Sequence, residues 1–270
     1  MISFPNAKIN LGLNVLSKRE DGYHNVNSLI YPVRLSDVLE VVEARKFSFS
    51  TSGLIIPGVD ADNLVVKAYH LLRKDFDLPA VSIHLHKTVP AGAGLGGGSS
   101  DGAFMLKMLN AMFELFLDDA ILEDYALQLG SDCPFFIRNE PAFVSGKGDA
   151  LEKSELELKE LIVCIVKPER GISTADAYRT VSPGIPDKDI RKIVEDHPVE
   201  AWRGILLNDF EEAFYKKLPE YGEIKHKLYE AGALYASMSG SGSAFYGIFR
   251  DSPELKGAFP DAWFTWEGTL

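Results

Sequence analysis

Cysteine is scarce in this chain of 270 residues, which contains only Cys133 and Cys164. Two cysteines so far apart form neither a disulfide framework nor a metal-ligand pattern, so we expect free thiols and a reducing compartment. No apolar run approaches the roughly 18 residues that a membrane-spanning helix needs. Residues 1–6 also lack a basic segment followed by an apolar one, the pattern of a targeting peptide. These absences favour a soluble, cytoplasmic protein.

Positive charge is also limited, because 28 Lys and Arg stand against 39 Asp and Glu and leave a net charge of −11. This balance argues against a nucleic-acid-binding protein. Hydrophobic residues make up 46% of the chain and charged residues 25%, as in ordinary globular proteins. The length and the acidic run at residues 152–160 predict two domains, residues 1–152 and 153–270.

Residues 6–15 alternate between apolar and polar side chains, which predicts a half-buried β-strand. The polar positions hold asparagine, lysine and glycine, although Thr, Lys and Glu are more usual on a solvated strand and Asn has low strand propensity. Two interpretations stay open: a solvated face of unusual composition, or a face that lines a site. The polar residues are Asn6, Lys8, Asn10, Gly12 and Asn14.

Further elements follow from periodicity and capping residues. A helix is expected from about residue 62, capped by Asp60 or Asp62, and a strand at residues 81–87. Another helix follows residue 100 with an apolar stripe from Ala103 to Leu117. The remaining expectations are a helix capped by Asp118 or Asp119 that ends at Gly130, strands at 142–144 and 161–166, a helix capped at residues 173–174, and a strand, turn and strand at 234–249. Strands interspersed with helix pairs predict an α+β protein.

Five glycines occupy residues 92–98, in a loop that runs from Pro90 to Ser100 and precedes a predicted helix. Glycines let a phosphate approach backbone N–H groups, and the positive end of the helix dipole points at the same place. A flexible turn is the alternative, but a turn rarely needs so many glycines. The loop therefore indicates an anion site.

Three familiar phosphate loops differ from this one. The P-loop requires a Gly-Lys-Ser/Thr ending, which is absent. Gly92, Gly94 and Gly97 match the dinucleotide-binding spacing, but two helices follow where that fold needs a second strand with an acidic end. The protein-kinase elements His-Arg-Asp and Asp-Phe-Gly are absent as well.

The loop instead resembles the phosphate loop of the galactokinase, homoserine kinase, mevalonate kinase and phosphomevalonate kinase (GHMP) superfamily. Residues 5–11 resemble the first motif of that superfamily, and residues 238–243 its third. Residues 7–11 followed by Asp21-Gly22-Tyr23-His24 are similar to the branch that acts in the non-mevalonate isoprenoid route. The resemblance implies a two-domain GHMP kinase fold: an ATP-binding N-terminal domain like domain 2 of ribosomal protein S5, and a ferredoxin-like C-terminal domain that contributes to substrate binding.

The resemblance implies a transfer of phosphate from ATP, as the Mg²⁺ complex, to a cytidine diphosphate-linked polyol. Lys8 would neutralise charge at the γ-phosphate, and Asp132 would accept the hydroxyl proton. Capping the turn at Pro134 is the alternative role of Asp132. The implied nucleotide-binding residues are Asn63, Lys87, Pro90, Gly92, Gly94, Leu95, Gly96, Gly97, Gly98, Ser99 and Ser100. The implied substrate-binding residues are Asn10, Tyr23, His24, Tyr178, Gly240 and Ser241.

Several roles stay open at this stage. Ser99 and Ser100 could cap the helix, contact phosphate or ligate Mg²⁺, and the metal ligands are unassigned. Tyr23 and Tyr178 could sandwich the cytosine ring, with His24 selecting its edge, or be ordinary core or surface aromatics. Two other functions compete with a small-molecule kinase: a nucleotide-dependent oxidoreductase and an inactive nucleotide-binding module. We expect neither nucleic-acid nor membrane partners, and a monomer or weak homodimer.

Overall fold

The computed structural model describes residues 1–270 and has both strands and helices throughout, which confirms the α+β prediction. The chain packs into two compact units. Unit 1 contains residues 1–7, 35–91 and 96–140, and unit 2 contains residues 8–34, 92–95 and 141–270. The predicted domain division at residue 152 stays a prediction.

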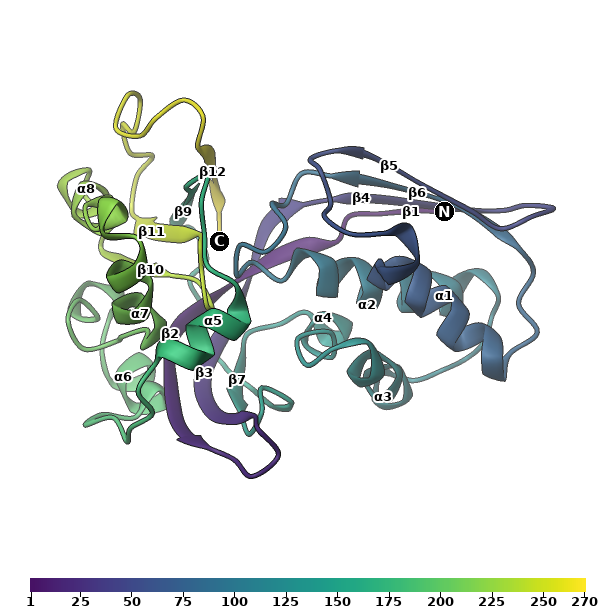
Figure 1. Ribbon diagram of the computed structural model, residues 1–270, viewed down its shortest axis with the longest axis horizontal. Helices are drawn as coiled ribbons and strands as arrows, with labels where there is room; N and C mark the ends of the chain where they lie inside the picture. The colour runs from purple at the N-terminus through teal and green to yellow at the C-terminus, as the bar shows by residue number, and fades with distance from the viewer. The chain divides into compact units, whose positions relative to one another are not determined.

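Unit 1 is a four-stranded sheet with helices on one face (Figure 1). The strand order is β1 (Ile2–Ser3), β4 (Val38–Glu43), β6 (Val81–Lys87) and β5 (Ser48–Gly53). β5 and β6 are parallel, joined through a helical crossover, and the other neighbours are antiparallel. The helices are η1 (Asp60–Asp62), α1 (Leu64–Asp75), α2 (Gly97–Met112), α3 (Asp119–Leu129) and α4 (Phe135–Arg138).

Unit 2 contains two four-stranded sheets. One has the order β10 (Tyr235–Met238), β11 (Phe245–Phe249), β9 (Ile162–Lys167) and β12 (Phe264–Thr269), with antiparallel neighbours. The other joins most of β2 (Asn6–Lys18) and β3 (His24–Ser36) to β7 (Ala142–Ser145) and β8 (Ala150–Lys153). The helices are α5 (Thr174–Thr180), α6 (Ile190–Asp196), η2 (Val199–Ala201), α7 (Phe210–Lys217), η3 (Pro219–Tyr221) and α8 (Ile224–Glu230).

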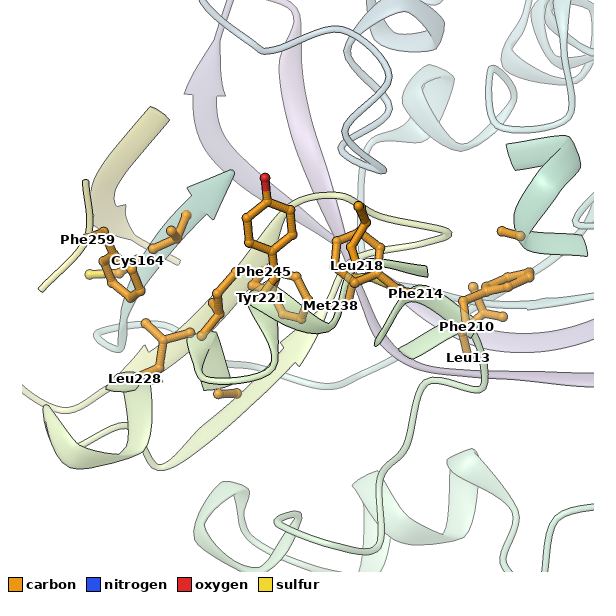
Figure 2. Close-up of a cluster of buried hydrophobic side chains, with 14 of the residues drawn as sticks. Leu13, Cys164, Phe210, Phe214, Leu218, Tyr221, Leu228, Met238, Phe245 and Phe259 are labelled. Atoms are coloured by element: carbon orange, nitrogen blue, oxygen red, sulfur yellow. The ribbon is translucent and has the colours of Figure 1, made fainter. Parts of the chain in front are cut away.

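An aromatic cluster forms the core of unit 2 (Figure 2). Phe210 and Phe214 are one turn apart on α7, so both point from the same face of that helix. Phe214 contacts Phe245 of β11 edge to face, with ring centroids 5.4 Å apart. Leu13 of β2 belongs to the same cluster. The cluster therefore packs β2 against the sheet and helices of the C-terminal half.

Two predicted helix boundaries are wrong. Asp60 and Asp62 lie inside η1, and Asn63 caps α1 instead, because its extended backbone lets the side chain accept a hydrogen bond from Val65 N at 2.9 Å. The stripe predicted to reach Leu117 stops with α2 at Met112. Phe116 has a φ of +55° and is 88% exposed. The Asn110 side chain donates to the carbonyl oxygen of Leu117 and accepts from its N–H group. These two hydrogen bonds close the turn after the helix.

The half-buried strand predicted at residues 6–15 is buried on both faces. Every residue from Ala7 to Val15 is buried, including Lys8, Asn10 and Asn14. The strand itself is confirmed, but the solvated interpretation of its polar face is wrong, because other elements of the chain cover that face.

Other local predictions are confirmed. Asp118 caps α3 through a bond from Ile121 N, and the helix ends at Gly130. Ser173 caps α5. Cys133 and Cys164 are buried free thiols, and burial raises the pKa of each to about 12. None of the helices combines the length and apolar character needed to cross a membrane.

Candidate active site

The glycine-rich loop uses backbone conformations that favour glycine. Gly92, Gly94 and Gly96 have φ values of +63°, +78° and +69°, in the left-handed region. A Cβ on Gly94 would lie 2.0 Å from the Ser239 carbonyl oxygen, whereas nothing lies within 4 Å of the position of a Cβ on Gly98. The loop therefore needs glycine for turning at three positions and for close packing at Gly94.

Helix α2 begins at Gly97, with Gly96 as its N-terminal flanking residue, so residues 97–100 of the predicted loop are its first turn and the helix starts earlier than expected. A backbone bond of 2.9 Å runs from Ser100 N to Gly96 O. Gly97, Gly98 and Ser99 come before Ser100 in the chain, so their N–H groups have no acceptor within the helix. They form the positive end of the helix dipole, which is suited to an anion.

Within unit 2, three hydrogen bonds hold the first half of the loop. Ser239 Oγ donates to Gly94 O at 2.8 Å, Lys8 N donates to Leu95 O at 2.9 Å, and Ala244 N donates to Ala93 O at 3.0 Å. The loop is thereby fixed to β2 and to the turn after β10. The first and third motifs of the sequence are brought together on the phosphate loop, although more than 200 residues separate them.

The polar side chains of β2 lie beside this junction. Lys8 and Asn10 are each 4% exposed, and Lys8 Nζ donates to Asn10 Oδ1 at 2.5 Å. Asn10 N donates to Ser239 Oγ at 3.2 Å. An ammonium group therefore lies on the strand that is hydrogen-bonded to the loop, and its predicted action at the γ-phosphate stays a prediction. Asp132 belongs to unit 1, and its pairing with Lys8 stays a prediction.

The side chain of Asn208 holds the third motif, residues 238–243, through two hydrogen bonds. Its Nδ2 donates to the carbonyl oxygens of Met238 and Gly240, both at 2.8 Å. Gly240 is buried, and Ser241 Oγ lies 3.1 Å from Thr174 Oγ1 at the start of α5. Asn208 thus fixes the turn that carries two predicted substrate-binding residues.

Around α2 in unit 1, the remaining loop residues differ in their surroundings. Pro90 is buried, and Ser100 Oγ is buried without a hydrogen-bond partner. Ser99 forms a hydrogen bond with the thiol of Cys133. Asp132 is half-buried at the turn before α4. Its role as the proton acceptor stays a prediction.

Lys87 has partners that the sequence analysis missed. Its ammonium group binds Asp37 and, at 2.7 Å, Asp101, and all three side chains are almost fully buried. Burial alone lowers the pKa of Lys87, but the charges of Asp101 and Asp37 outweigh it and raise the pKa. Burial raises the pKa of Asp101 to about 8, against the opposing effect of Lys87.

A sequence signal for this cluster existed. Lys87 follows Val81, Ile83 and Leu85 in the buried register of β6, and a lysine at such a position needs a buried carboxylate. The predicted nucleotide contact of Lys87 stays a prediction, as does that of Asn63, whose side-chain oxygen is used in capping α1.

The predicted substrate aromatics occupy different environments in unit 2. His24 stacks on Tyr178, with ring centroids 4.9 Å apart and an interplanar angle of 25°. Burial, together with the charge of Lys18, lowers the pKa of His24. Tyr23 is 63% exposed, and Lys147 Nζ lies 5.5 Å from its ring centroid. The structure thus brings His24 and Tyr178 together and leaves the Tyr23 ring accessible.

Comparisons with known proteins agree with this arrangement. The profile of the GHMP kinases N terminal domain matches residues 63–140, and that of the GHMP kinases C terminal domain matches residues 193–262. The 4-diphosphocytidyl-2-C-methyl-D-erythritol kinase of Bacteroides fragilis is 50% identical over 260 residues, which cover 95% of this chain and 94% of that protein. The protein of the same name from Parabacteroides distasonis is 46% identical over 272 residues, covering 100% of both chains.

Solved structures show the same relationship. A crystal structure of 4-(cytidine 5'-diphospho)-2C-methyl-D-erythritol kinase has a TM-score of 0.79 at 34% identity, covering 92% of this chain and 90% of that one. The mevalonate kinase of Methanococcus jannaschii has a TM-score of 0.72 at 16% identity, covering 99% of this chain and 97% of that one. The second match shows a shared fold.

Proposed function

Because the chain belongs to the GHMP kinase family, we propose that it transfers the γ-phosphoryl group of ATP to the 2-hydroxyl group of 4-diphosphocytidyl-2-C-methyl-D-erythritol. The products are the 2-phosphate and ADP, in the non-mevalonate route to isoprenoid precursors. The observation that carries the proposal is the glycine loop, which leads into the N–H groups of the first turn of α2 and whose Leu95 carbonyl accepts a hydrogen bond from the backbone of Lys8.

The loop and Lys8 supply the electrostatic part of the mechanism. Phosphoryl transfer requires positioning and neutralisation of charge more than covalent chemistry from the protein. The N–H groups of Gly97, Gly98 and Ser99 hold phosphate oxygens, and the Lys8 ammonium neutralises charge at the γ-phosphate. Asn10, on the same strand, contacts the phosphate acceptor. Asp132 accepts or orients the proton of the attacking hydroxyl group.

We propose that Mg²⁺ enters as its complex with ATP. No group of three or more His, Cys, Asp and Glu side chains is arranged to hold a metal ion, and Mg²⁺ in such enzymes is held largely by the phosphates and water. When bound, the ion neutralises charge on the β- and γ-phosphates. The Ser100 hydroxyl group has no hydrogen-bond partner, so it would be available as a protein ligand of the ion.

Recognition of cytidine involves unit 2. The stacked pair of His24 and Tyr178, with the exposed ring of Tyr23, provides aromatic faces for the base, and His24 supplies a polar group for its edge. Stacking tolerates any base, so the choice of cytosine requires hydrogen bonds. Gly240 and Ser241 also bind the cytidine substrate. Asn63 and Lys87 bind ATP. Residues 1–152 then act as the ATP-binding domain, and residues 153–270 contribute to the substrate.

We further propose a cytoplasmic enzyme that works as a monomer or weak homodimer. The two buried, unpaired thiols agree with a reducing compartment. Sedimentation of the purified protein at micromolar concentration measures the oligomeric state.

A coupled assay of ADP release tests the function. The purified protein receives ATP and Mg²⁺ with the diphosphocytidyl polyol, mevalonate, homoserine or galactose, and with no acceptor. We expect turnover only with the cytidine substrate. Turnover with another acceptor would identify a different GHMP-type kinase. Nucleotide binding in calorimetry without turnover on any acceptor would identify an inactive binding module.

The role of Asp132 is tested by Asp132→Asn. We expect turnover to fall by roughly 10² to 10⁴ with near-parental substrate affinity, the usual loss for a positioned base. Lys8→Met also lowers turnover, and the double variant is little worse than the worse single variant, because the two groups act together. Asp124→Asn on the exposed face of α3 is the control. Additive losses in the double variant would contradict the joint role.

A further inference from the structure

A buried chain of polar groups runs across β2 and β3 in unit 2. Lys8 Nζ donates to Asn10 Oδ1 at 2.5 Å, Asn10 Nδ2 donates to Ser28 Oγ at 2.8 Å, and Ser28 Oγ donates to Gly12 O at 2.6 Å. Ser28 is 2% exposed, and the function proposed above assigns it no part. This chain of polar groups includes the ammonium group that the proposed mechanism uses.

The direction of these bonds follows from the chemistry of the end groups. A backbone carbonyl such as that of Gly12 only accepts, so the single hydroxyl proton of Ser28 is used there. The Ser28 oxygen is then an acceptor toward Asn10, and only the NH₂ group of the amide can donate to it. The carbonyl oxygen of Asn10 must therefore face Lys8. Lys8, which only donates, requires the same orientation, so Lys8 and Ser28 hold opposite ends of one amide.

The backbone of Asn10 is fixed independently. Its N–H donates to Ser239 Oγ at 3.2 Å, and its carbonyl accepts from Tyr246 Oη at 2.7 Å. Because the N–H and the carbonyl group of Asn10 are both hydrogen-bonded, a change at Ser28 affects the rotation of the Asn10 side chain. It leaves the backbone of β2 in place. This separates orientation of the amide from placement of the strand.

We propose that Ser28 is a positioning residue for phosphoryl transfer, which directs the Lys8 ammonium toward the γ-phosphate by fixing the amide of Asn10. This proposal rests on the function proposed above. Without the hydroxyl group, the Asn10 NH₂ group loses its buried acceptor, and the side chain can rotate toward another acceptor, which takes its oxygen away from Lys8. The ammonium group moves away, and a small misplacement of a catalytic group lowers turnover strongly.

Kinetics of Ser28→Ala provide the first test. We expect kcat to fall by roughly 10-fold to 100-fold, with KM values for ATP and the acceptor within about twofold of the parent. Ser28→Thr keeps the hydroxyl group and restores most of kcat. Ser154→Ala removes another buried serine, whose hydroxyl oxygen accepts a hydrogen bond from Leu156 N, and is the matched control for loss of a buried hydroxyl. Parental kcat in folded Ser28→Ala would overturn the proposal.

A double-mutant cycle tests whether Ser28 acts through Asn10. In the background of Asn10→Ala, removal of the Ser28 hydroxyl should change kcat by less than twofold. A merely structural serine would lower kcat by the same factor in both backgrounds, and that result would overturn the proposal. If Ser28→Ala does not fold, Ser28→Cys, which has a weaker donor of similar size, takes its place in the cycle.

An NMR measurement separates this proposal from the proposed function. In the free protein, exchange of the Asn10 side-chain amide protons with water should accelerate at least tenfold in Ser28→Ala and return to the parental rate in Ser28→Thr. If the parent lacks activity on the cytidine substrate but this pattern is observed, the proposed function fails and the role of Ser28 in orienting the amide stands. Unchanged exchange in Ser28→Ala would overturn the positioning role, whatever the activity.

Discussion

At the scale of single residues, the unusual feature of unit 1 is two buried carboxylates that share one ammonium group. Asp37 Oδ1 also accepts hydrogen bonds from the backbone N–H groups of Thr88 and Val89. Asp101 Oδ1 has no hydrogen-bond partner. A second full negative charge there would be poorly compensated, which explains why burial raises the pKa of Asp101 to about 8.

The raised pKa of Asp101 predicts a pH dependence of stability. The folded protein holds this proton more tightly than the unfolded chain, whose ordinary pKa is 3.8. The stabilisation is complete below pH 4 and is lost as the pH rises through about 8, by at most about 1.4 kcal/mol per pH unit. Asp101→Asn should remove this part of the decline, as measured by urea unfolding between pH 5 and 9. Parallel pH curves for parent and variant would show that Asp101 is charged throughout.

Tyr23 provides a second prediction at this scale. Its exposed ring is available to stack on a base, so Tyr23→Ala should raise KM for the cytidine substrate at least tenfold, which corresponds to about 1.4 kcal/mol. The KM for ATP should hardly change. Tyr23→Phe keeps the ring and serves as the control. Equal losses for both substrates would point to damaged folding instead of a lost stacking surface.

At the scale of elements, the glycine loop joins β6 to α2 while its middle residues bind to β2 and to the turn after β10. Glycine is needed for two distinct reasons along this one segment. Gly92 and Gly96 turn the chain, whereas Gly94 both turns it and lies against the Ser239 carbonyl. The loop is therefore set by packing against distant residues as much as by its own flexibility.

A matched pair of alanine substitutions tests this account. Gly94→Ala introduces a Cβ 2.0 Å from the Ser239 oxygen at a φ of +78°, so we expect at least a tenfold loss of ATP affinity and a lower Tm. Gly98→Ala meets nothing within 4 Å in the first turn of α2 and should keep or raise Tm. Calorimetry and thermal unfolding measure both effects. Parental ATP affinity in Gly94→Ala would exclude this loop as the phosphate site.

At the scale of the whole molecule, the net charge of −11 opposes the approach of polyphosphate substrates. Salt screens such long-range repulsion, because the Debye length falls from about 30 Å at 0.01 M to about 8 Å at 0.15 M ionic strength. We therefore expect the association rate constant of Mg²⁺-ATP to rise about twofold over this range. Stopped-flow measurements with a fluorescent ATP analogue provide the check. A falling rate constant would mean that the local field of the loop and Lys8 governs the encounter.

The sequence by itself determined the features that depend on local sterics and periodicity. Alternation predicted β6, Asp118 and Gly130 marked the ends of α3, and the glycines predicted an anion-binding loop before a helix. The motifs also predicted the family. Each of these signals lies within about ten consecutive residues, where backbone conformation and side-chain spacing suffice.

Only the tertiary structure decided which faces are covered and which polar groups meet. The alternation of β2 left its polar face either solvated or lining a site; the structure buries that face, and the backbone of Asn10 bonds to Ser239 and Tyr246, more than 200 positions away. The carboxylate partners of Lys87 come from the residue between β3 and β4 and from α2, far from Lys87 in the sequence. Such contacts depend on how distant segments pack, and a buried polar group takes whichever partner that packing brings within hydrogen-bonding distance.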